Sequence, residues 1–175
     1  MSGTGLKGAV GEFRVWKWAE RLLPRRDYVH FHDVWLPTPM SKTQIDHVFV
    51  SRAGVFVVET KNYEGWIHGK ADNDTWTQTF ANGTRHQFRN PLRQNEWHVR
   101  VLARVLRPSG ITPANLHSVV AFVGRAEFKT KVPNNVRIGP DFAHYIRSFA
   151  APVLSESRVD SVRHAITATR IRSAC

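Results

Sequence analysis

Two short apolar runs joined by a turn constrain the fold of this chain more than any other feature. Residues 44–50 and 55–61 are both rich in Val and Phe, and residues 51–54 between them end in a glycine. Such runs are typical of strands that are central in a sheet and buried on both faces. The sequence therefore predicts a β-hairpin in the middle of an α/β domain.

Charged residues lie at the open end of this hairpin. Asp46 is near the start of the first run, and Glu59 and Lys61 close the second, so antiparallel pairing brings all three to the same end. Side chains alternate along a strand, which places Glu59 and Lys61 on one face and Thr60 on the other.

The length of the turn decides whether Asp46 joins the other two charges. A two-residue Ala53-Gly54 turn sets Asp46 opposite Lys61, and a four-residue turn over residues 51–54 sets it opposite Glu59. A three-residue turn without a bulge would pair Asp46 with Thr60 and scatter the charges. The first two registers both cluster the charges on one face, and the sequence leaves the choice between them open.

Clustered carboxylates are costly unless a cation lies between them, because each raises the pKa of the other. Mg²⁺ is a hard cation that prefers oxygen ligands and keeps positions for water and a phosphate. A lysine beside such a site can hold the attacking water or stabilise developing charge. The hairpin end is therefore a candidate metal-dependent catalytic site.

The spacing of these residues resembles that of a known nuclease superfamily. An Asp followed by Glu-x-Lys at the end of an apolar strand resembles the PD-(D/E)XK nucleases, which have a restriction-endonuclease-like fold. Residues 44–47, 59–63 and 65–69, with Gly65-Trp66-Ile67-x-Gly69 in the last, are similar to the nuclease-related domain (NERD) branch. The resemblance covers roughly residues 5 to 125.

The resemblance implies a single α/β domain over residues 1–175, with a mixed central β-sheet flanked by α-helices and C-terminal helices within 140–172. It implies Mg²⁺-dependent hydrolysis of phosphodiester bonds, with DNA as the expected substrate and Mn²⁺ able to replace Mg²⁺. Asp46, Glu59 and the backbone carbonyl of Thr60 would bind metal, and Lys61 would position or activate the water. The choices between DNA and RNA, and between endonuclease and exonuclease, stay open. So does homodimer formation.

Two further residues enter the expected site through the resemblance. Glu12 falls within the apolar stripe of a helix expected over residues 8–23, and the family places a glutamate on its first helix to hold a metal-bound water or a second ion. The alternative is a glutamate at the stripe edge that reaches solvent. Gln94, near the start of a later helix, would orient the water or a neighbouring side chain; the alternative is a solvated first turn.

The charge of the chain favours a polyanionic partner. Lys and Arg number 25 against 14 Asp and Glu, which gives a net charge of +11 and a pI near 10.7. Nucleic acid, an anionic membrane surface or another acidic partner would each suit this excess. No apolar run is long enough to span a membrane and no signal-peptide pattern is present, so a cytoplasmic protein without a membrane partner is expected. The single Cys175 permits no internal disulfide.

A row of arginines lies on the helix that contains Gln94. Asn90 and Pro91 predict the start of this helix, as N-cap and first helical residue, and it should run to about Leu106. At helical spacing, one narrow stripe would then present fork-shaped donors to a phosphate backbone. A merely solvated face is the alternative. The residues of this arginine stripe are Arg93, Arg100, Arg104 and Arg107.

The rest of the sequence predicts the other helices and strands. The helix over 8–23 should bury a stripe, and a strand over 28–36 carries His30 and His32 on one face. These two histidines are a conceivable metal pair, but with no third ligand in view packing or surface positions are favoured. The stripe comprises Ala9, Phe13, Trp16, Ala19 and Leu23. Strands are expected at 65–69, 75–80, 116–123 and 136–138, and helices at 141–150 and 155–172.

A second class of function fits the same composition. The chain could be a non-catalytic nucleic-acid-binding or regulatory module, because a fold does not guarantee its chemistry. Clustered carboxylates argue against it, since they would repel the phosphates that such a module binds.

Overall fold

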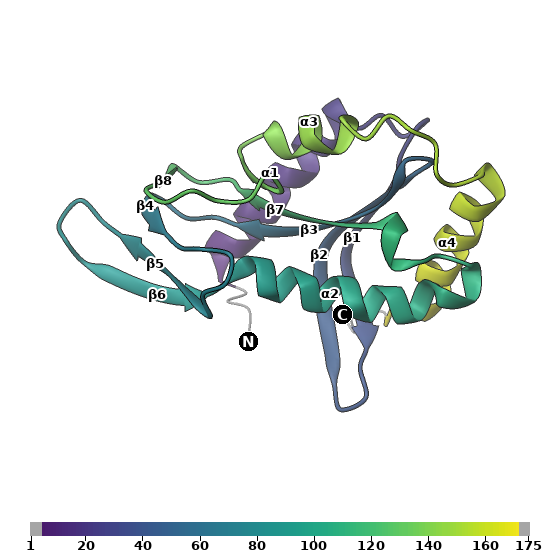
Figure 1. Ribbon diagram of the computed structural model, residues 1–175, viewed down its shortest axis with the longest axis horizontal. Coiled ribbons are helices and arrows are strands. Elements are labelled where there is room, and N and C mark those ends of the chain that lie inside the picture. The colour runs from purple at the N-terminus through teal and green to yellow at the C-terminus, as the bar shows by residue number, and fades with distance from the viewer. Residues whose placement is uncertain (1–4, 172–175) are drawn as a thin grey trace.

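A five-stranded mixed sheet forms the centre of the computed structural model, which describes residues 5–171 (Figure 1). Its strand order is β1-β2-β3-β7-β9, antiparallel from β1 to β3 and parallel from β3 to β9. The strands are β1 (Val29–Pro37), β2 (Lys42–Ser51), β3 (Gly54–Lys61), β7 (Leu116–Phe122) and β9 (Val136–Ile138). This is the mixed α/β architecture expected of a restriction-endonuclease-like fold.

A second, four-stranded sheet extends to one side of the molecule, at the left of Figure 1. Its order is β6-β5-β4-β8, so the expectation of a single sheet was incomplete, and the strands β6 and β8 were not predicted. The chain leaves β3 and turns at Gly65, whose φ of +82° suits glycine and whose absent Cβ would lie 2.6 Å from the Thr79 carbonyl oxygen. These strands are β4 (Gly65–His68), β5 (Thr75–Thr79), β6 (Arg85–Arg89) and β8 (Ala126–Phe128).

Helices cover both faces of the five-stranded sheet. On one face α1 (Leu6–Leu22) and α3 (Asp141–Arg147) pack against Phe49, Phe56 and Val58. On the other face α2 (Pro91–Leu106) and α4 (Glu156–Thr169) pack against the alternating valines of β2 and β3. The prediction that the hairpin strands are buried on both faces is therefore confirmed.

The buried face of α1 differs from the expected stripe. Phe13 and Trp16 are 53% and 37% exposed, Ala9 is also exposed, and only Ala19 and Leu23 of the predicted set are buried. The helix instead packs through Gly11, Val15 and Ala19. The predicted stripe was centred on the large side chains of Phe13 and Trp16 and left out Val15, whereas the core-facing position at the closest approach is Gly11, which adds nothing to an apolar stripe.

The later helices follow their sequence signals closely. The Asn90 side chain accepts a hydrogen bond from the Leu92 N–H at 2.9 Å, and α2 ends at Leu106 as predicted. In α4, Val162 and Ile166 are buried. α3 ends at Arg147, three residues before the predicted end. Cys175 and Arg172, the predicted end of the last helix, lie outside the described residues.

Among residues 5–171, no helix is long and apolar enough to cross a bilayer.

Candidate functional site

The hairpin register places Asp46 in line with Glu59. Ser51 pairs with Gly54, so only Arg52 and Ala53 form the turn, and pairing continues to His47 opposite Val58. The next position along this register sets Asp46 against Glu59. This is the register of the four-residue-turn alternative, with Ser51 and Gly54 paired and not part of the loop.

The backbone pairing between β2 and β3 ends at His47 and Val58, and a hydrogen bond from a backbone to a side chain follows it. The Thr60 N–H donates to the Asp46 carboxylate at 2.7 Å. The Asp46 side chain thus replaces a backbone acceptor of the neighbouring strand and is held beside the end of β3. One of its oxygens is engaged in this way, and the other is available for a further ligand.

Lys61 lies between Glu59 and α2. Its ammonium group donates to Glu59 Oε1 at 2.7 Å and to Gln94 Oε1 at 3.1 Å. Glu59 is 2% exposed and the Lys61 side chain 14% exposed, so this is a buried ion pair. Gln94 is also buried, which excludes the solvated first turn considered for it.

His98 is a member of this cluster that the sequence reasoning missed. Its Nδ1 lies 3.3 Å from Glu59 Oε2, and both side chains are almost fully buried. His98 Nδ1–H can therefore donate to this carboxylate oxygen, and the contact helps to lower the pKa of Glu59. The available signal was the i,i+4 spacing from Gln94, which places both side chains on one face of α2.

The surroundings of Asp46 and Glu59 shift the pKa values of their carboxyl groups in opposite directions. Burial raises the pKa of Asp46 well above its ordinary value, and the charge of Glu59 raises it further. Burial also acts to raise the pKa of Glu59, but Lys61 and then His98 outweigh it and lower that pKa. Glu59 is therefore the ionised member, and Asp46 lacks a cation of its own.

Glu12 reaches the site because α1 approaches β3 closely at Gly11. A Cβ at Gly11 would lie 2.8 Å from the Asn62 Cβ and 3.3 Å from a Thr60 methyl carbon, so only glycine fits without displacement. Asn62 also donates to the Lys7 carbonyl at 2.7 Å, which fixes the start of α1. Half-buried Glu12 has a raised pKa, through burial first and then the charges of Asp33 and Glu59.

Asp33 is a second residue that the sequence did not indicate. It is the one non-glycine residue with a positive φ, 50°, among residues 5–171, and its carboxylate accepts from Gln44 at 2.8 Å. It interrupts the β1 and β2 pairing where it would otherwise oppose Asp46. A strained acidic residue beside Glu12 adds negative charge to the same end of the sheet.

The arginine stripe is exposed along its whole length, but its members differ. Arg93 forms an ion pair with Asp74 and donates to the Asp72 carbonyl at 2.6 Å, so it fastens α2 to the turn before β5. Arg107 lies just beyond α2, in a short 3-10 helix over Arg107–Ser109. Arg100, Arg104 and Arg107 have no ion-pair partner within the part of the chain that the structure describes.

Part of the chain is similar to a curated protein. A curated relative, an uncharacterised protein of Bacillus anthracis, is 42% identical over 97 residues. The aligned region is 55% of this chain and 45% of the relative, so the chain spans less than half of that protein's length. No solved structure matches the chain.

The family model for the nuclease-related domain matches residues 7–123, the region that contains the hairpin, Glu12 and α2. The match extends over more than half of the chain, so this protein belongs to the nuclease-related domain (NERD) family.

Proposed function

We propose that this protein is a Mg²⁺-dependent nuclease that hydrolyses phosphodiester bonds in DNA. The observation that carries the proposal is the position of Asp46, a partly buried carboxyl group with a raised pKa, in register with the ionised and buried Glu59. A cation bound between the two would relieve their repulsion, and Lys61 is already committed to the other side of Glu59.

The residues present fit a hard divalent cation. The candidate ligands are all oxygens: the carboxylates of Asp46, Glu59 and Glu12 and the backbone carbonyl of Thr60. Asp46 has a raised pKa beside the buried and ionised Glu59, which is the environment in which a bound cation is useful. When bound, Mg²⁺ would lower the pKa of a coordinated water and neutralise charge on the phosphate.

Each side chain at the site has its own proposed role, either to position another group or to stabilise charge. Lys61, held by Glu59 and Gln94, would hold the attacking water or the phosphate oxygens. Gln94 fixes the direction of that ammonium group. Glu12, with its raised pKa, would accept a hydrogen bond from water at the α1 side of the site.

The net charge of +11 supports a nucleic-acid substrate. Arg100, Arg104 and Arg107 are exposed on and just beyond the helix that holds Gln94, so a phosphate backbone lying along α2 would lead to the site. These three arginines are the proposed phosphate contacts, with Arg93 in a mainly structural position.

A substrate panel tests this proposal. Labelled single-stranded DNA, duplex DNA, covalently closed circular DNA and RNA would be incubated with Mg²⁺, Mn²⁺ or EDTA. We expect cleavage of DNA with either metal and none in EDTA, and linearisation of the closed circle would identify an endonuclease. Cleavage of RNA alone would overturn the choice of DNA, and binding without any cleavage would overturn the enzyme in favour of a binding module.

A further inference from the structure

A cluster of histidines lies on the sheet face that packs against α1, away from the carboxylates. His30 and His32 alternate onto the same face of β1, and His47 lies directly opposite His32 on β2. Rings of all three surround Phe49, with centroid distances of 5.0, 5.9 and 6.1 Å. Since Asp46 and His47 are consecutive in one strand, their side chains leave the sheet on opposite faces.

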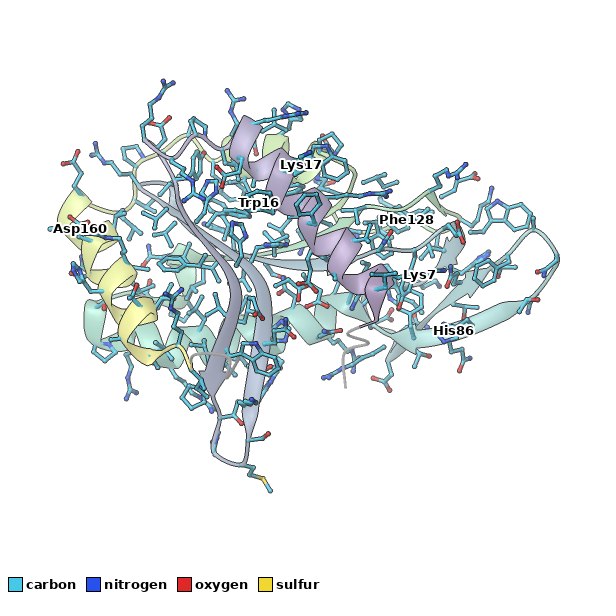
Figure 2. All side chains as sticks on the ribbon, turned by 180° about the vertical axis from the view of Figure 1, so that it is seen from behind. Lys7, Trp16, Lys17, His86, Phe128 and Asp160 are labelled. Atoms are coloured by element: carbon cyan, nitrogen blue, oxygen red, sulfur yellow. The ribbon has the colours of Figure 1, made fainter. Side chains whose placement is uncertain are left out.

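The helix above this face supplies the third donor that the sequence did not reveal. Figure 2 shows α1 crossing in front of the sheet, with the labelled Trp16 and Lys17 one turn before Glu20. One ligand atom from each of Glu20, His30 and His32 lies within 4.8 Å of the others. Within this set, Glu20 Oε1 lies 3.5 Å from His30 Nδ1.

The hydrogen bonds of His30 fix which nitrogen faces the carboxylate. His30 Nε2 lies 2.7 Å from the Leu23 carbonyl, which can only accept, so Nε2 carries the proton. In the neutral ring Nδ1 is then a bare lone pair, and it points at an oxygen that also only accepts. The His30 side chain has no exposed surface, so water does not separate the two atoms. A cation between them would satisfy both.

His32 is arranged in the same way. Its Nδ1 lies 2.7 Å from His47 Nδ1, so one proton is shared between these two nitrogens. With His32 as the donor, its Nε2 becomes a second bare lone pair, and that atom has no partner. A metal-binding histidine commonly donates its other N–H to a carbonyl or another acceptor, as His30 does to the Leu23 carbonyl and as His32 would do to His47 in this tautomer.

We propose that Glu20, His30 and His32 bind a zinc-like transition-metal cation, with His47 and the Leu23 carbonyl orienting the two imidazoles. Two imidazole nitrogens and one carboxylate oxygen are a ligand set that suits Zn²⁺ and leaves a fourth position open. Ligands of one zinc ion lie at most about 4.2 Å apart, so a cluster within 4.8 Å needs only a small side-chain adjustment.

The site would join α1 to β1. Arg25 already donates to both oxygens of Glu20, so one oxygen can stay with Arg25 while the other turns to the metal. Such a bond would fix the C-terminal half of α1 on the sheet, two turns after Glu12. The oxygen-only set of Asp46, Glu59 and Glu12 selects for Mg²⁺, whereas the imidazoles select for Zn²⁺, so the two sites would not compete.

Zinc binding to metal-stripped full-length protein tests this inference. Zn²⁺ would be titrated in the presence of millimolar Mg²⁺ against a chromophoric chelator, and Co²⁺ would report imidazole ligation through its visible absorption. We expect one equivalent bound and a rise in Tm. Glu20→Gln, His30→Gln and His32→Gln should lose this equivalent, and His47→Gln should weaken it by about 10- to 100-fold.

Two controls separate this site from other zinc binding. His86→Gln, at an exposed position on β6 (Figure 2), and Asp46→Asn should both bind Zn²⁺ as the wild type does. Because His30 is buried and its replacement can disturb folding, Glu20→Gln is the deciding variant. Wild-type protein that binds no Zn²⁺, Glu20→Gln that binds it unchanged, or Asp46→Asn that loses it would each overturn the proposal.

Discussion

The carboxylate of Asp46 accepts a hydrogen bond from the backbone N–H of Thr60 at 2.7 Å, at the position where β2 and β3 cease to pair. A side chain proposed as a metal ligand therefore also completes the sheet. Removing the negative charge of Asp46 and removing its hydrogen-bond acceptor are therefore two separate changes.

Asp46→Asn should keep the hydrogen bond to Thr60 and remove the charge, whereas Asp46→Ala removes both. We expect Asp46→Ala to be less stable than Asp46→Asn by about 0.5 to 1.5 kcal/mol, the net contribution of one hydrogen bond. Urea denaturation of the two variants in EDTA measures this difference. Equal free energies of unfolding would show that the bond does not support the fold.

The raised pKa of Asp46 predicts how the free energy of unfolding changes with pH. The folded state holds this proton more tightly than the unfolded state, so the contribution is full below the ordinary value of 3.8. It is lost as pH rises through the raised pKa. In EDTA the wild type should therefore lose stability relative to Asp46→Asn as pH rises above 3.8 and through the raised pKa. Addition of Mg²⁺ at pH 8 should restore it. A constant difference across this range would contradict the assigned environment.

Lys61→Met should be strongly destabilising because it leaves the Glu59 carboxylate buried without its ion-pair partner. We expect a loss of about 3 to 5 kcal/mol in the free energy of unfolding. The double variant Glu59→Gln with Lys61→Met should recover much of this loss and remain inactive. Lys129→Met, which removes a partner from the exposed pair with Glu127, is the matched control and should change stability little. A similar loss in both single variants would contradict the buried character of the Glu59 pair.

Gly11→Ala should destabilise the protein although alanine favours helices. In an exposed helix interior this substitution stabilises by about 1 kcal/mol. Here the added Cβ would meet the Asn62 Cβ at 2.8 Å and push α1 away from β3. We expect a lower free energy of unfolding together with weaker cleavage, because Glu12 moves with the helix. A stabilised variant would show that α1 does not approach β3 this closely.

Salt titration of DNA binding in EDTA tests the arginine stripe. The triple variant of Arg100, Arg104 and Arg107 to Gln should lower the slope of log affinity against log salt by about 2 to 3 units, if each arginine neutralises one phosphate. Affinity for different sequences should fall equally, since phosphates carry no base identity. Arg93→Gln should leave the slope nearly unchanged, because its partners are Asp74 and the Asp72 carbonyl. Identical slopes for wild type and triple variant would identify a merely solvated face.

The sequence was informative where local chemistry decides the structure. Asn90 and Pro91 marked the start of α2, and the Val and Phe runs marked β2 and β3, because capping and two-sided burial both leave a local signal. The charges at the hairpin end followed from alternation along the strands. They cluster in either the two-residue or the four-residue turn register, because both place Asp46, Glu59 and Lys61 on one face of the sheet.

The rest depends on contacts between distant segments. The packing of α1 through Gly11 is set by Asn62 and Thr60, about 50 residues away, and periodicity favours large apolar residues such as Phe13 over glycine. His98 enters the site because Glu59 is held under α2. Glu20 meets His30 only because the chain folds back after α1, so no local pattern could reveal Glu20 as the third proposed zinc ligand.

Cleavage and binding by wild type and Asp46→Asn, measured on the same labelled DNA, test the central claim most directly. We expect the wild type to cut in Mg²⁺ and not in EDTA. We expect Asp46→Asn, purified in the same way, to bind that DNA at least as tightly and to yield no product, because it loses a metal ligand and a negative charge near phosphate. Cleavage by Asp46→Asn at the wild-type rate per bound substrate, or cleavage by the wild type that persists in EDTA, would contradict it.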